Sequence, residues 1–304
     1  MLDAGDTVLG ARAVPALPGG ASNAASSLMT IPATMTAGAY FIIGQADANA
    51  TVAETSEVNN TRAGGLVKIG ADLVVSVAMP PPVGAGVSFV VTDTTKNSGA
   101  APADGTSTAI YLSANAVLDA ADVLLGTRLV PPLGLNGAHT ASTTVQIPAS
   151  TPTGTYYLLA MADADGRIAE GNEANNTAAA IMRVGPDLIV TALSAPASAA
   201  SGTAIAVTDT VKNQGGGAAA ASATTFYLST NASLDTNDTF LATRAVGSLN
   251  TGGTASGSTV MTLPAGLPTA SFYVIAVADG DVQVSETSET NNSRAVLVRV
   301  SAAP

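Results

Sequence analysis

The sequence contains no cysteine and no tryptophan, and only 11% of its 304 residues are charged. Without cysteine no disulfide framework can form, and thiolate zinc sites and thiol catalysis are excluded. No apolar run approaches the roughly 20 residues that a membrane-spanning helix needs, so membrane insertion is not expected. The first residues, Met1–Asp6, also lack the basic and then apolar regions of a signal peptide.

Positive charge is scarce as well. Eleven Lys and Arg oppose 22 Asp and Glu, which gives a net charge of −11, and the basic residues form no cluster. Nucleic acid and anionic membrane surfaces are therefore poor partners. Hydrophobic residues make up 47% of the chain but aromatic residues only 4%, so any core must be built from small side chains.

One acidic segment occurs three times, and the copies begin at Asp47, Asp163 and Asp279, which are 116 residues apart. We call it the acidic turn motif. Its copies comprise Asp47, Asn49, Val52, Glu54, Glu57, Asn59 and Asn60; Asp163, Asp165, Ile168, Glu170, Glu173, Asn175 and Asn176; and Asp279, Asp281, Val284, Glu286, Glu289, Asn291 and Asn292. A period of this length indicates duplicated whole domains, because solenoid and propeller periods are nearer 20–50 residues.

The repeat divides the chain into a partial first repeat, residues 1–70, and two complete ones, residues 71–185 and 186–304. Residues 2–15 match residues 118–131, so the sequence starts in the middle of a repeat. We expect the native protein to continue upstream through a complete domain and a secretion signal. The junctions between repeats are only a few residues long, which predicts a stiff, extended rod.

Apolar residues alternate with polar ones along most of each repeat, a pattern that predicts half-buried strands. About seven strands per complete repeat, separated by Gly, Pro, Asn and Asp, predict an all-β fold of tandem antiparallel β-sandwiches. Met29 and Ile31 predict a strand in the first repeat, and the run 218–221 is interpreted as a loop. The clearest strand has the inward set Tyr156, Leu158, Ala160 and Ala162, with copies at Tyr40, Ile42, Gly44 and Ala46 and at Phe272, Val274, Ala276 and Ala278.

These residues resemble the CARDB family, a bacterial cell-adhesion-related domain with an immunoglobulin-like sandwich. The resemblance rests on the segments 186–188, 211–215, 227–229, 154–157 and 173–176, and it covers nearly the whole chain. It implies an extracytoplasmic binding or scaffolding module without an activity of its own. The sequence departs from the family at Asp93 and Asp209, where an apolar or small residue is usual, and the first repeat lacks the opening half.

The acidic turn motif is the main candidate site. Glu170 and Glu173 could act as a catalytic acid and base, but the pair recurs in every copy. An active site is rarely needed in each copy of an array, whereas a turn that holds two strands is. Asn175 and Asn176 fit such a turn because Asn tolerates left-handed backbone. The sequence therefore predicts a protein that is not an enzyme.

Calcium binding is the alternative for the same residues, since calcium prefers carboxylate oxygens. The candidate ligands are Asp163, Asp165, Glu170 and Glu173 in the second repeat and Asp279, Asp281, Glu286 and Glu289 in the third. A second acidic loop, at Asn115–Asp122 and again at Asn231–Asp238, adds oxygen donors. Neither loop has EF-hand spacing, and hydrogen-bonded turns without metal are favoured.

Other chemical groups are isolated. His139 is the only histidine and has no partner acid fixed by sequence, and the sequons at Asn59, Asn175 and Asn291 overlap the turn motif. Two functions remain: an adhesive or structural stalk at the cell surface or in the extracellular space, and an accessory module of a secreted enzyme that binds calcium or carbohydrate. The expected partners are neighbouring repeats and a protein or glycan ligand. Scarce aromatics, several at inward positions, favour the stalk.

Overall fold

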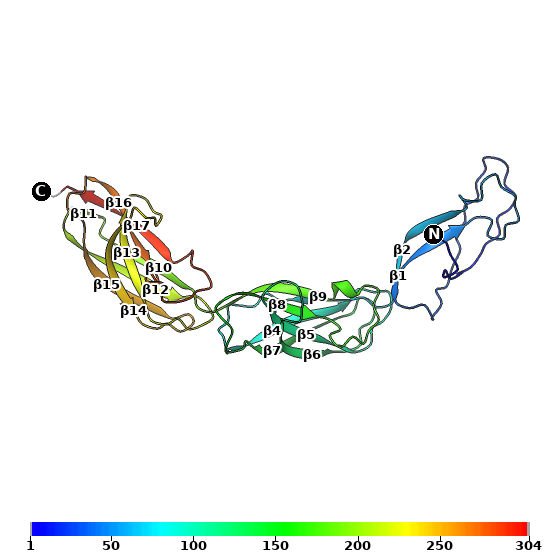
Figure 1. Ribbon diagram of the computed structural model, residues 1–304, viewed down its shortest axis with the longest axis horizontal. Coiled ribbons are helices and arrows are strands. Elements are labelled where there is room, and N and C mark those ends of the chain that lie inside the picture. The colour runs from blue at the N-terminus through cyan, green and yellow to red at the C-terminus, as the bar shows by residue number, and fades with distance from the viewer. Residues whose placement is uncertain (1, 303–304) are drawn as a thin grey trace.

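The computed structural model describes residues 2–302, in which three bodies follow one another along the chain (Figure 1). Nearly all regular structure is β, as the alternating pattern predicts. Within the described residues no helix is long and apolar enough to cross a membrane.

The second repeat is a two-layer β-sandwich. Its strands are β3 (Leu73–Val77), β4 (Ser88–Asn97), β5 (Thr106–Ser113), β6 (Val123–Val130), β7 (Ala138–Gln146), β8 (Gly154–Met161) and β9 (Thr177–Val184). One sheet has the order β3-β4-β7 and the other β6-β5-β8-β9, and the pairings are antiparallel. A short 3-10 helix, η1 (Glu173–Asn175), precedes β9.

The third repeat has the same plan. Its strands are β10 (Leu188–Ser194), β11 (Ser198–Ala200), β12 (Ala204–Asn213), β13 (Ser222–Ser229), β14 (Thr239–Val246), β15 (Thr254–Thr262), β16 (Ala270–Val277) and β17 (Ser293–Ser301). The sheets have the orders β10-β12-β15 and β11-β17-β16-β13-β14, and the added β11 pairs parallel to β17.

Each sandwich closes over small and branched side chains, as the low aromatic content predicts. In the second repeat Val91 and Val145 from one sheet meet Ile110 and Leu158 from the other. In the third, Phe226 and Val274 lie in the equivalent layer. Tyr156, Leu158 and Ala160 all contribute to the core, which confirms the inward set of that strand.

The first repeat consists of one antiparallel hairpin, β1 (Gly38–Gln45) with β2 (Thr61–Ile69). The predicted strand at Met29 and Ile31 is wrong: residues 22–31 form no strand. Its counterpart β7 pairs with β4, and the first repeat has no counterpart of β4. For the same reason Ile42 is 42% exposed, whereas its counterpart Leu158 is fully buried.

Asp93 and Asp209 point into the sandwich and are almost fully buried. Each forms an ion pair with an arginine from the opposite sheet, Arg128 on β6 or Arg244 on β14. Arg128 also reaches Thr95 Oγ1, 3.2 Å away. Asp93 and Asp209, which depart from the family pattern, are therefore buried together with a charged partner, because an unpaired buried carboxylate is costly.

The larger sheets contain five tyrosines, of which Tyr156 points inward and the other four lie on the outer face. Tyr111 and Tyr157 alternate with core residues of β5 and β8, so they lie on the outer face, and Tyr227 and Tyr273 repeat this arrangement in β13 and β16. Tyr227 packs edge-on against Phe240, with ring centroids 6.2 Å apart. Phe89, Phe226 and Phe272 pack in the cores, as Tyr156 does, which confirms that several aromatic residues lie inward.

Candidate functional site

The acidic turn motif follows β8 in the second repeat, and its first carboxylate builds the turn. Asp163 has a left-handed backbone with φ of 48°. Its side chain accepts hydrogen bonds from the backbone N–H groups of Arg167 (3.1 Å) and Ile168 (3.0 Å). Asp279 and Asp47 do the same in their own turns. This part of the motif therefore forms in all three copies, whether or not the repeat is complete.

Glu170 connects that turn to the first strand of the repeat. Its Oε2 accepts the backbone N–H of Leu73, which lies 97 residues earlier, and its Oε1 accepts Asn176 Nδ2 at 2.9 Å. Glu173 completes the local network by accepting the N–H of Glu170 at 3.1 Å. A backbone hydrogen bond from Gly171 N to Ala71 O, 2.9 Å, runs beside these contacts.

Asn175 adds a second contact to the same strand, because its Nδ2 donates to Asp72 Oδ1 at 2.9 Å. We call Glu170, Asn175 and Asn176, with Asp72 and Leu73, the strand clamp. The third repeat reproduces it with Glu286, Asn291 and Asn292 on Asp187 and Leu188. The clamp fastens the opening strand of each complete repeat to its last loop.

The first repeat shows what the clamp requires. Glu57 still accepts the N–H of Glu54 at 3.1 Å and Asn60 Nδ2 at 3.3 Å. Within residues 2–302, however, the Glu54 carboxylate accepts no hydrogen bond. The described part of this repeat, residues 2–70, contains no opening strand that could supply a counterpart of Leu73. The motif thus folds locally, and its clamp function depends on the missing half.

Burial changes the acidity of the clamp carboxylates. Glu170 is 6% exposed and Glu286 8% exposed, and burial raises the pKa of each from 4.5 to about 7, although hydrogen bonds from Leu73 and Leu188 act in the opposite direction. Burial also raises the pKa of Asp279. The hydrogen bond from Thr106 lowers the pKa of the exposed Asp165.

The predicted calcium ligands are already engaged with protein donors. Asp165 accepts from the N–H of Ser107 at 3.1 Å and pairs with Arg167 Nε at 2.8 Å. Asp163 and Glu170 accept backbone N–H groups, as described above. Across the described residues, no group of three or more His, Cys, Asp or Glu is arranged to hold a metal ion. Calcium binding at these eight carboxylates stays a prediction.

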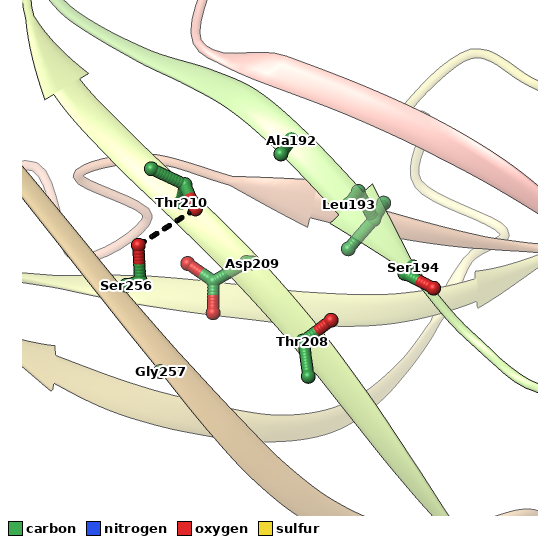
Figure 2. Close-up of a pocket in the computed structure, with 8 residues that line it drawn as sticks. All are labelled: Ala192, Leu193, Ser194, Thr208, Asp209, Thr210, Ser256 and Gly257. Atoms are coloured by element: carbon green, nitrogen blue, oxygen red, sulfur yellow. Dashed lines mark hydrogen bonds between the residues drawn. The ribbon is translucent and has the colours of Figure 1, made fainter.

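Two hollows on the surface lie elsewhere. One, of about 370 Å³, lies on the smaller sheet of the third repeat, where Asp209 is flanked by Thr208, Thr210 and Ser256 (Figure 2). Thr210 and Ser256 share a hydrogen bond of 2.8 Å across this hollow. The other, of about 560 Å³, lies between the second and third repeats. Neither is lined by a residue of the acidic turn motif, so Glu170 and Glu173 do not face these hollows.

The remaining candidates have structural contacts. His139 Nδ1 lies 2.9 Å from Arg128 Nη1, beside the Asp93 ion pair. In the second acidic loop, Asp119 and Asp122 accept backbone N–H groups of their own turn. Asn175 and Asn291, the first residues of two sequons, belong to strand clamps.

The Asp93–Arg128 and Asp209–Arg244 pairs were missed by sequence reasoning. Both members recur at the 116-residue offset in the two complete repeats, and Arg12 occupies the same position in the first. The recurrence of both an aspartate and an arginine at the same offset could have identified the ion pair from the sequence. Arg12, whose aspartate partner would belong to the missing half, instead donates to Asn23 Oδ1 at 2.5 Å.

Comparisons with solved structures give partial similarity. The chain is similar to the CARDB domain of the PF1109 protein from Pyrococcus furiosus, crystallised in complex with di-metal ions (23% identity, 38% of this chain and 88% of that chain, TM-score 0.30). It is also similar to residues 272–376 of a putative cell surface protein from Methanosarcina acetivorans (20% identity, 38% and 92%, TM-score 0.29). A red sea bream transglutaminase matches at 14% identity over 76% of this chain and 31% of its own, with a TM-score of 0.40.

None of the curated proteins matches this chain. The CARDB family model, in contrast, matches twice, at residues 70–180 and 185–296. These two segments include both strand clamps and both buried ion pairs, and together they cover more than half of the sequence. The chain therefore belongs to the CARDB family and consists of tandem immunoglobulin-like β-sandwiches, the first of them incomplete.

Proposed function

We propose that this chain is a non-enzymatic stalk module of a cell-surface or secreted adhesion protein. The observation that carries the proposal is the strand clamp, in which the acidic turn motif of each complete repeat holds the opening strand in place. The end-to-end arrangement of the repeats (Figure 1) suits a spacer. Membership of CARDB, a cell-adhesion-related family, supports an extracellular or surface location.

Pulling on the two ends of a single molecule tests the stalk function. Because the second and third repeats have separate cores, we expect two distinct unfolding events. Each should release a contour length of roughly 350–400 Å, from about 110 residues at 3.3–3.6 Å each. Extension without resolved force peaks would show that the repeats do not resist mechanical force and would contradict the stalk function.

A second candidate function is an accessory module that binds carbohydrate. The specific observation in its favour is the outer-face pair of tyrosines in each complete repeat, with Phe240 beside Tyr227. Aromatic rings at a flat surface can stack on the apolar faces of sugars. This function predicts binding on a glycan array that Tyr227→Ala weakens. Val260→Ala, an exposed change on the smaller sheet of the same repeat, should leave it intact.

A further inference from the structure

The junction between the second and third repeats contains an unusually close backbone contact. An ideal Cβ placed on Gly216 would lie 2.1 Å from Val83 N and 2.2 Å from the carbonyl carbon of Pro82. Real Cβ atoms do not approach backbone atoms so closely. Gly216 belongs to the third repeat and Pro82 and Val83 to the second, so only glycine permits this contact between them.

Backbone hydrogen bonds continue through the same contact. Gly185 N donates to Val83 O at 3.0 Å, and Gly217 N donates to Gly185 O at 2.9 Å. Thr251 Oγ1 donates to Gly216 O at 2.8 Å and holds the loop from the other side. Of these bonds, the one from Gly217 to Gly185 joins the two repeats, and the other two fix its two sides within the second and the third repeat.

The second repeat presents a rigid surface to Gly216. Val83 is buried in the core and its N–H donates to Arg183 O on β9 at 3.0 Å. Three consecutive prolines, residues 80–82, precede it and restrict the backbone to a narrow range of φ. Gly84 completes the surface, since a Cβ there would lie 2.9 Å from Gly216 O.

The first junction provides an internal comparison. Gly70 takes the place of Gly185, and both have a positive φ. Ala101 N donates to Gly70 O at 3.1 Å, as Gly217 N does to Gly185 O. Ala100, however, stands where the third repeat has Gly216. Ala100 is exposed, so its methyl group is not packed against the hairpin of the first repeat.

We infer that Gly216 and Gly84 form a fixed-angle joint that locks the third repeat onto the second. The joint goes beyond the proposed stalk function and does not depend on what the protein binds. It assigns a task to Gly216: direct backbone packing on the preceding repeat sets the angle between two sandwiches.

Distances between two spin labels test the joint in the full chain. The protein has no cysteine, so labels can be attached through Val90→Cys on β4 and Val260→Cys on β15, both exposed positions. With the native joint we expect one narrow distance distribution. Gly216→Ala should broaden the distribution and displace its maximum, because the added methyl forces the two backbones apart.

Gly84→Ala is the second variant, which approaches the contact from the other repeat and should have the same effect. Gly247→Ala is the matched control, since a Cβ there meets nothing within 4 Å, and it should leave the distribution unchanged. Circular dichroism of each variant establishes that both sandwiches remain folded. A broad distribution in the labelled parent, or identical distributions for Gly84→Ala and Gly247→Ala, would overturn the joint. Either result would leave the two force peaks of the proposed stalk unaffected.

Discussion

Glu170 and Glu286 hold the opening strands while buried, and their charge state therefore links folding to pH. Each has a folded pKa of about 7 against 4.5 for an ordinary glutamate. A raised carboxyl pKa means that the folded state binds the proton more tightly than the unfolded state does. The stabilisation that comes from protonating each buried glutamate is fully present below about pH 4.5 and is lost as the pH rises through about 7.

We accordingly expect the melting temperature of the chain to fall between pH 5 and pH 8. The double variant Glu170→Gln/Glu286→Gln should remove most of this slope, because glutamine does not titrate. It should also lower stability at every pH, since one amide N–H₂ replaces an acceptor of a backbone or asparagine N–H. Thermal unfolding followed by circular dichroism at several pH values measures both effects. An equal slope in the variant would assign the pH dependence to other carboxyls.

The aspartate–arginine pair between β4 and β6 is a buried polar contact between the two sheets of the second repeat. Asp93 is 1% exposed, so removal of Arg128 leaves a buried carboxylate without its partner. We expect Arg128→Met to cost about 3–5 kcal/mol of unfolding free energy. Asp93→Val combined with Arg128→Met should cost less than Arg128→Met alone.

A double-mutant cycle by urea denaturation tests this coupling. The equivalent cycle at Asp209 and Arg244 serves as an independent replicate in the third repeat. Additive effects of the two single changes would show that the two charges do not stabilise each other.

Sequence patterns predicted the strands better than they predicted the partners of polar residues. The alternation around Tyr156 and Leu158 is local information, and the structure has the expected strand there. Met29 and Ile31 show the same local pattern but form no strand, because a strand also needs a neighbour, and β4 has no counterpart in the first repeat. The alternation of apolar residues within one segment does not indicate whether a neighbouring strand is present to pair with it.

The candidate site was recognised for similar reasons, but its role was only partly foreseen. Three copies of the acidic turn motif pointed to a turn, and Asp163 does build one. The contact from Glu170 to Leu73 joins residues 97 positions apart. The spacing of residues within the motif cannot reveal this contact, because Leu73 lies outside the motif. The hydrogen bond from the backbone N–H of Leu73 identifies the opening strand as the target of Glu170.

At the scale of the whole molecule, the three repeats should differ in resistance to protease. The first repeat has two strands and exposes Phe41, Ile42 and Leu66, whereas the other two have closed cores. We expect limited proteolysis to remove residues before about Gly70 well before it cuts either complete repeat. Mass spectrometry of the products identifies the order of cleavage. Equal protection of Tyr40 and Tyr156 in a monomeric sample would contradict this expectation.

Calcium provides a second test on the whole chain. Because the motif carboxylates already accept hydrogen bonds from protein groups, we expect millimolar calcium to leave the melting temperature unchanged. Binding to the folded state alone would raise it. An increase that a chelator reverses and that Asp163→Asn abolishes would establish the calcium site predicted from the sequence. Asp47→Asn is the matched control in the incomplete repeat.

The central claim is that the acidic turn motif closes a complete repeat by clamping its opening strand. Urea unfolding of Glu170→Ala and Glu54→Ala tests it most directly, because the two residues occupy the same motif position and only Glu170 has a strand to hold. We predict that Glu170→Ala lowers the unfolding free energy of the second repeat by about 1–3 kcal/mol, because a buried N–H is left unpaired, and that its urea midpoint falls accordingly. Glu54→Ala should leave every transition unchanged. Equal effects of the two substitutions, or no effect of Glu170→Ala, would contradict the claim.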